Sequence, residues 1–201
     1  MLQEGSFFKL IKLTKAWEAK QPPKTQILAS YEAACAGSDI VIGAGLTLTQ
    51  SLCMAQKLNA SWIPVILGPT YPTSEYPLWA LKSLACCSCL NKWTYNVVFN
   101  ALWGQEEKSI NAWRTGSLGL AALPKKGQGS MDVIRAQQTA VIICASPITS
   151  GPNQRVPGDW PAFVHMHGFL FAPNDGIVGQ ATIDPRVEEF VASGEKGGID
   201  T

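Results

Sequence analysis

The sequence lacks several features that would assign a protein to a class at once. No apolar run reaches the roughly 18 residues that a membrane-spanning helix needs. Lysines interrupt the N-terminal stretch FFKLIKLTKAWEAK, which is therefore unlike a secretory signal peptide. Basic and acidic residues nearly balance, at 16 against 15, which disfavours a nucleic-acid-binding surface. We therefore expect a cytoplasmic protein that binds no nucleic acid.

Motifs for common catalytic and metal sites are also missing. The sequence contains no Gly-x-Ser-x-Gly nucleophile motif and no phosphate-binding P-loop. Residues 43–45 (GAG) match only part of a dinucleotide fingerprint, because Leu48 occupies its third glycine position, so a small-residue turn is the better interpretation. Residues 86–89 (CCSC) have no second cysteine pair, which favours reduced, buried thiols on a helix over zinc ligands. The residues by themselves contain no catalytic constellation.

Histidine is scarce, and its two occurrences lie close together. His165 and His167 would point to one face of a strand, as metal ligands do, but no third ligand stands at suitable spacing. We expect no metal site, and interpret the pair as a hydrogen-bonded interdomain position.

What the sequence does contain is an alternation of apolar strands and amphipathic helices. This alternation predicts an α/β fold with a parallel, Rossmann-like sheet. Only about four strands are predicted, and the first predicted element is a helix, whereas complete sheets of this class usually begin with a strand. We therefore expect an incomplete sheet. The predicted strands cover residues 40–42, 65–67, 140–145 and 163–171, and the predicted helices cover residues 7–20, 25–36, 46–58, 76–90, 92–113 and 185–192.

Three regions follow from this pattern. Residues 1–24 form an amphipathic helix and linker, residues 25–172 an α/β lobe, and residues 173–201 a linker and a divergent tail. The first helix is interpreted as a surface helix, with peripheral membrane contact through its lysines and aromatic residues as the alternative. Tryptophan and phenylalanine in the middle helices either pack the core or line an apolar cleft.

The most specific signal is the segment PTYPTSEYP at residues 69–77, directly after a predicted strand. Loops at the carboxyl ends of parallel strands are where open α/β sheets bind ligands. The segment resembles the PWTPTxEFP loop of the sterol glucosyltransferases, with Thr70 and Tyr71 in place of the family's Trp and Thr. These are UDP-sugar-dependent enzymes of the two-lobed GT-B class, related to glycosyltransferase family 28.

Further stretches resemble the same family in the same order. Residues 91–120 are similar to the pattern NxxSY…W…INxFR…LGL. Residues 159–169 (DWPAFVHMHGF) are similar to DWPxxVHVTGYxF, with His167 in place of the usual Thr. Residues 187–196 resemble a helix that precedes the family's donor lobe. The glycine-rich loop GSRGDVQP and the donor lobe of the family have no counterpart in the sequence.

The resemblance implies the acceptor-binding part of an enzyme that transfers a hexose, with glucose favoured, to the hydroxyl of a sterol or other lipid. It implies a catalytic residue upstream of Met1 and a UDP-sugar on a C-terminal donor lobe, so no catalytic residue or cofactor is expected here and the chain alone should be inactive. His165 and His167 would lie between the lobes. The residues expected to bind the acceptor are Pro69, Thr70, Tyr71, Pro72, Thr73, Tyr76, Trp79, Phe99 and Trp103.

A second class stays open, that of a non-catalytic lipid-binding or partner module completed by a separate donor-lobe chain. A flavodoxin-like nucleotide binder would need a phosphate loop, which the sequence lacks. An isolated lobe would expose apolar surface meant for its partner, so we expect it to self-associate.

Overall fold

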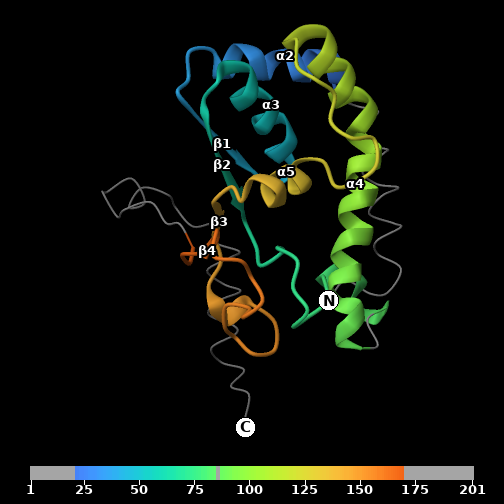
Figure 1. Ribbon diagram of the computed structural model, residues 1–201, viewed down its shortest axis with the longest axis vertical. Helices are drawn as coiled ribbons and strands as arrows, with labels where there is room; N and C mark the ends of the chain where they lie inside the picture. Colours follow the sequence, from blue (N-terminus) through green and yellow to red (C-terminus); the bar gives the residue numbers. More distant parts are fainter. Residues whose placement is uncertain (1–20, 85–86, 170–201) are drawn as a thin grey trace, which may run out of the picture. The chain divides into compact units, whose positions relative to one another are not determined.

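The computed structural model describes residues 21–84 and 87–169 (Figure 1). The chain divides into one compact unit from Met1 to Phe169 and a second from Leu170 to Thr201. The second unit and the predicted helices at residues 7–20 and 185–192 lie outside the described residues.

Four parallel strands form one sheet in the described part of the chain. Their order in space is their order in the sequence, β1-β2-β3-β4, and the register joins Ile42 to Ile63, Val65 to Ile142, and His165 to Ile142. The predicted α/β fold with a parallel sheet is confirmed, and it is compatible with a Rossmann-like fold. The strands are β1 (Ile40–Ala44), β2 (Ser61–Ile66), β3 (Val141–Ile143) and β4 (Val164–Met166), the last two shorter than predicted.

Four α-helices accompany these strands among the described residues. None of the described helices is long and apolar enough to cross a membrane. They are α2 (Lys24–Cys35), α3 (Leu48–Leu58), α4 (Asn91–Trp113) and α5 (Ser130–Gln137). Short 3₁₀ turns occur at Gly45–Thr47, Trp79–Leu84, Ser88–Leu90 and Pro147–Thr149, and a π-helical turn follows α4 at Arg114–Leu118.

Three features of the structure differ from the prediction. The helix predicted over residues 76–90 is wrong, because Leu81 has a non-helical backbone and the segment breaks into two 3₁₀ turns. Helix α5 was not predicted, because its eight residues give little more than two turns of periodicity after a glycine-containing loop. The expectation of reduced thiols at residues 86–89 assumed a continuous helix, and it is wrong for Cys87, which is disulfide-bonded.

The described helices pack on one face of the sheet, to the right of and above the strands in Figure 1. On this face Val41 of β1 contacts the α3 core around Cys53. Trp62 of β2 donates its indole N–H to Ser51 Oγ of α3 at 2.9 Å. Along β1 burial alternates, so every second side chain is buried under α3, whereas the last three residues of β2 are all buried.

The opposite face of the sheet is much more exposed. Ile40 and Ile42 of β1 are 56% and 65% exposed. In β3, Ile142 is half-buried although its neighbours Val141 and Ile143, which point to the helical face, are fully buried. Parallel sheets are usually covered on both faces. The described helices cover only one, and on the other face the exposure is concentrated at β1, because Val65 of β2 is buried there.

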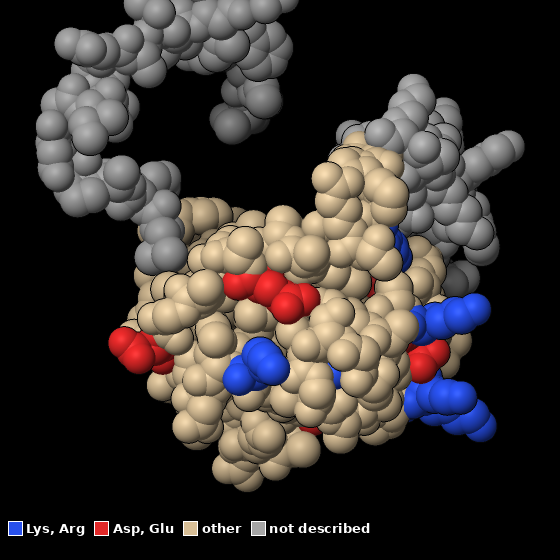
Figure 2. Space-filling view, turned by 90° about the horizontal axis from the view of Figure 1, so that it is seen from above, with Lys and Arg blue, Asp and Glu red and all other residues tan. Residues whose placement is uncertain are grey.

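Surface charge is mixed on the side of the molecule nearest α2. Seen from above, most of the visible described surface is neither acidic nor basic, and side chains of both signs are scattered across it (Figure 2). Charges of opposite sign that are interspersed in this way produce no strong field of a single sign.

Gly43 offers a direct test of how closely α3 packs on β1. A Cβ at this position would lie 1.7 Å from Ser51 Oγ. We therefore expect Gly43→Ala to lower the free energy of unfolding by about 1–3 kcal/mol, measured by chemical denaturation. Gly104→Ala is the control, because this exposed α4 position has no atom within 4 Å and should gain up to about 1 kcal/mol. Equal effects at the two positions would contradict the packing described for Gly43.

Candidate functional site at the carboxyl edge of the sheet

The segment at residues 69–77 follows the carboxyl end of β2, as the sequence predicted. Because all four strands are parallel, the segments after β1, β2, β3 and β4 leave the same edge of the sheet. Ligands of open α/β sheets bind at this edge. We therefore take the carboxyl edge, with the loops of residues 67–78 and 144–163, as the candidate site.

Every strand in the described sheet is followed closely by a large, exposed apolar side chain. Leu46 follows β1, Leu67 follows β2, Ile148 follows β3 and Phe169 follows β4, with exposed fractions of 83%, 65%, 63% and 50%. We call these four residues the apolar rim. Large apolar side chains exposed together mark surfaces that bind a ligand or a partner.

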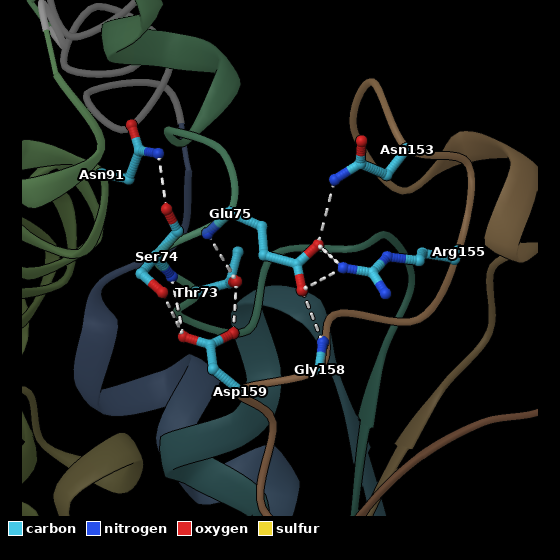
Figure 3. Close-up of polar contacts among 8 residues, drawn as sticks. All are labelled: Thr73, Ser74, Glu75, Asn91, Asn153, Arg155, Gly158 and Asp159. Carbon is cyan, nitrogen blue, oxygen red and sulfur yellow. Dashed lines mark hydrogen bonds and ion pairs between the residues drawn. The ribbon is translucent and has the colours of Figure 1, made fainter.

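Asp159 connects the two loops of the candidate site (Figure 3). Its carboxylate accepts hydrogen bonds from Thr73 Oγ1 at 2.5 Å, from the Ser74 backbone N–H at 2.8 Å and from Ser74 Oγ at 2.9 Å. Lys92 Nζ lies 2.9 Å from the same carboxylate. The loop after β2 is thereby held against the loop after β3.

These contacts also decide the protonation state of Asp159. Partial burial of the carboxylate opposes its ionisation, but hydrogen bonds from Thr73, Ser74 and Lys92 outweigh burial and hold the pKa of Asp159 well below its usual range. A carboxylate with so low a pKa is a poor proton acceptor at neutral pH. Asp159 is thus suited to positioning the loops rather than to proton transfer.

Glu75 makes a second connection between the same loops. Its carboxylate accepts hydrogen bonds from the Gly158 backbone N–H at 2.6 Å, from Arg155 Nη2 at 3.2 Å and from Asn153 Nδ2 at 3.3 Å (Figure 3). The hydrogen bond from Gly158, assisted by Asn153 and Arg155, lowers the pKa of Glu75. Both acidic residues of this region are therefore engaged in holding loop against loop.

The start of α4 is attached to the same loop. Asn91 Nδ2 donates to the Ser74 carbonyl at 2.7 Å (Figure 3). The buried Thr94 hydroxyl accepts a hydrogen bond from the Leu78 backbone N–H at 2.8 Å and donates to the Asn91 carbonyl at 2.6 Å. The middle of the first family-like stretch thus meets the beginnings of the stretches at residues 91–120 and 159–169 at one place.

Other residues of the second stretch have structural roles at the end of α4. The buried Arg114 guanidinium donates to the Ala121 carbonyl at 2.9 Å and to Gln56 Oε1 at 2.8 Å. Asn111 exchanges two hydrogen bonds with the Leu123 backbone. Both side chains bind the backbone of the non-helical segment after α4, and the Leu123 groups that Asn111 satisfies are buried, which explains why polar residues stand in an otherwise apolar region.

Three of the predicted acceptor-binding residues in the loop point inward. Tyr71 is 4% exposed and packs edge-on against Trp160 and Phe163, with ring centroids 6.0 and 6.4 Å apart. Thr73 is fully buried at Asp159. Tyr76 is also buried, and its burial raises its pKa to about 12.

The remaining predicted acceptor-binding residues are spread over several surroundings. Trp103 is buried, donates its indole N–H to the Pro124 carbonyl at 2.9 Å and packs over Gly129. Phe99 is half-buried between two core clusters, and Trp79 is 60% exposed. The structure thus does not bring the predicted residues together on one surface. The three other predicted acceptor-binding residues of the loop, Pro69, Thr70 and Pro72, are half-buried.

His165 and His167 stack on each other at the β4 edge of the sheet. Their ring centroids lie 5.9 Å apart with planes inclined by 23°, and both residues are exposed. No group of three or more His, Cys, Asp or Glu side chains within residues 21–84 and 87–169 could hold a metal ion. The interdomain role of this pair stays a prediction.

Sequence reasoning missed both the apolar rim and the role of Asp159. The sequence patterns placed Leu67 and Phe169 inside predicted strands and Leu46 inside a predicted helix, whereas β2 ends at Ile66 and β4 at Met166, so their exposure could not be foreseen. Asp159 and Thr73 are separated by 86 positions in the sequence. The one available signal was that the segments DWP and PTSEYP both belong to stretches that resemble the sterol glucosyltransferases.

Substitution of Asp159 tests the connection between the loops. Asp159→Asn removes the negative charge and replaces one carboxylate oxygen by an N–H₂ group, which cannot accept hydrogen bonds from Thr73 and Ser74. We therefore expect a loss of about 1.5–3 kcal/mol in unfolding free energy at pH 7. Because the folded pKa is lowered, this contribution is present above the unfolded pKa near 4 and disappears as the pH falls below it. Denaturation curves of the two proteins should converge on acidification.

The control for this measurement is Lys92→Met, which removes an exposed ion pair to the same carboxylate. Exposed pairs contribute about 0–1 kcal/mol, so the loss should be clearly smaller. A difference between Asp159→Asn and the unsubstituted protein that does not change with pH would contradict the assigned pKa shift.

Comparison of the chain with protein-family models finds no match, and comparison with curated proteins finds none either.

Proposed function

We propose that the chain is the acceptor-binding part of a UDP-sugar-dependent glycosyltransferase of the GT-B class. The enzyme would transfer a hexose, with glucose favoured, to the hydroxyl of a sterol or another lipid. The observation that carries the proposal is the meeting of the three family-like stretches, through Thr73, Asn91 and Asp159, at the carboxyl edge of a parallel sheet. Resemblances scattered over the chain without a structural reason would not be expected to converge in this way.

The chemistry of the carboxyl edge supports an apolar acceptor. Burying apolar surface contributes roughly 25 cal/mol per Å², so a rigid hydrocarbon skeleton gains most from a surface of exposed aliphatic and aromatic side chains. The apolar rim provides such side chains after each strand. The neighbouring carboxylates of Glu75 and Asp159 are already hydrogen-bonded and offer little to a polar ligand.

The same residues indicate which part of the reaction we assign to this chain. Sugar transfer requires a base at the acceptor hydroxyl and stabilisation of the departing diphosphate. Because Asp159 and Glu75 both have lowered pKa values and hold loops, neither is assigned as that base. We assign this chain to acceptor binding, with the catalytic base and the UDP-sugar held by other parts of the enzyme. His165 and His167, close to the rim residue Phe169, remain proposed interlobe residues.

Binding of a fluorescent sterol to the purified chain tests the acceptor site. We expect saturable binding that weakens at least several-fold in Leu67→Asp, because the rim would then carry a charge that the ligand cannot pair. Trp93→Asp is the control, because Trp93 is exposed on α4, outside the rim, and its substitution should leave the affinity unchanged. Absence of saturable binding, or equal weakening in the two variants, would remove the proposed acceptor site.

A radiolabelled transfer assay tests the division of labour. The chain alone, given UDP-glucose and a sterol, should form no glycoside although it binds the sterol. Formation of glycoside would show that the base and the donor site are present in this chain, contrary to the proposal. If the N-terminal segment with the glycine-rich loop and the donor lobe of a sterol glucosyltransferase, supplied together, also restore no transfer while the sterol still binds, the alternative of a non-catalytic lipid-binding module is favoured.

A further inference from the structure

Strand β1 has an open edge in the described sheet. It pairs with β2 only, so the backbone groups on its other side have no strand partner among the described residues. The strand reads IVIGA and has neither a charged residue nor a proline. Natural edge strands usually carry such residues, because an unprotected edge is a template for another strand.

The same strand and the turn that follows it carry a concentration of exposed apolar side chains. Ile40, Ile42 and Leu46 are all among the exposed large hydrophobic residues, within a stretch of seven positions. The opposite edge of the sheet differs, since β4 has only three residues and one of them is His165. An open edge and exposed isoleucines therefore coincide at β1 and only there in the described sheet.

We propose that β1 binds β1 of a second copy of this chain in antiparallel orientation, with Ile42 at the two-fold axis. In this register Ile42 lies opposite Ile42 of the second copy, and Ile40 lies opposite Ala44. Val41 lies opposite Gly43, on the face covered by α3. The two sheets become one sheet that continues across the axis, with hydrogen bonds between the Ile42 backbone groups of the two copies. The Ala44 N–H and carbonyl are already hydrogen-bonded to Thr47 Oγ1, at 3.2 and 2.9 Å, so the pairing is centred on Ile42 and does not extend over the whole strand.

The sequence around β1 favours a second copy in this orientation. Antiparallel pairing centred on Ile42 places Asp39 opposite Gly45, so no like charges face each other. In-register parallel pairing would place Asp39 beside Asp39 of the second copy and would not close into a two-fold dimer. Antiparallel pairing also brings the exposed isoleucines of both copies together on the open face of the sheet.

This inference depends on the fold and is independent of the proposed function. Leu46 belongs to both surfaces, but the rim residues Leu67, Ile148 and Phe169 follow other strands and Ile42 lies outside the rim. Variants at Leu67 and at Ile42 therefore test sterol binding and association through β1 separately.

Sedimentation analysis of the full 201-residue chain over a range of concentrations tests the association. The unsubstituted chain, of 21.6 kDa, should form a dimer. Ile42→Lys should shift it to the monomer, because two lysines would face each other at the axis. Ile148→Lys is the matched control, since Ile148 is as exposed as Ile42 but follows β3, and it should remain a dimer. Circular dichroism verifies that both variants are folded.

Cysteine cross-linking tests the register. Opposite residues of an antiparallel pair have Cα atoms about 4.5–5.5 Å apart, within disulfide range, so Ile42→Cys should form an intermolecular disulfide identified by mass spectrometry. Ile40→Cys should not, because the two copies of residue 40 would be more than about 13 Å apart. A monomeric unsubstituted chain, a dimer that survives Ile42→Lys, or equal cross-linking at both positions would each overturn the proposal.

Discussion

The ionised carboxylate of Asp159 holds together two loops that the sheet by itself would leave independent. It receives a backbone N–H and two hydroxyl hydrogen bonds from Thr73 and Ser74, and it pairs with Lys92 at the start of α4. A buried threonine hydroxyl and a backbone N–H are costly to leave without an acceptor. Together with the contacts of Glu75 and Asn91, this side chain sets the position of the loop after β2 and hence the shape of the carboxyl edge.

The motif residues of this protein act mainly as scaffold. Asn91, Thr94 and Arg114 satisfy buried backbone or side-chain groups, and Trp103 fills the space between α4 and the loop before α5. The exposed apolar side chains that follow the strands are instead those of the apolar rim, of which only Phe169 belongs to one of the family-like stretches. A resemblance of this kind therefore indicates how the carboxyl edge is built, and the surface that it presents follows from the exposed residues around it.

The two faces of the sheet have different consequences. On the helical face, Gly43 and Ser51 allow α3 to lie directly on β1, and the side chains between them are closely packed. On the other face, Ile40 and Ile42 are exposed. Since burial of apolar surface is the main favourable term in folding and association, an uncovered isoleucine row on an open edge strand is the part of the described structure best suited to another polypeptide.

Local pattern was sufficient to predict the α/β class, the parallel sheet, helices α2, α3 and α4, and the place of the loop after β2. Apolar runs and helical periodicity extend over neighbouring residues, so the sequence determines them by itself. It could not determine that residues 76–90 break into short turns, that Tyr71 and Thr73 point inward, or that Asp159 joins two loops. Those features depend on partners tens of positions away, and only the tertiary structure decides which side chains meet and which remain exposed to solvent.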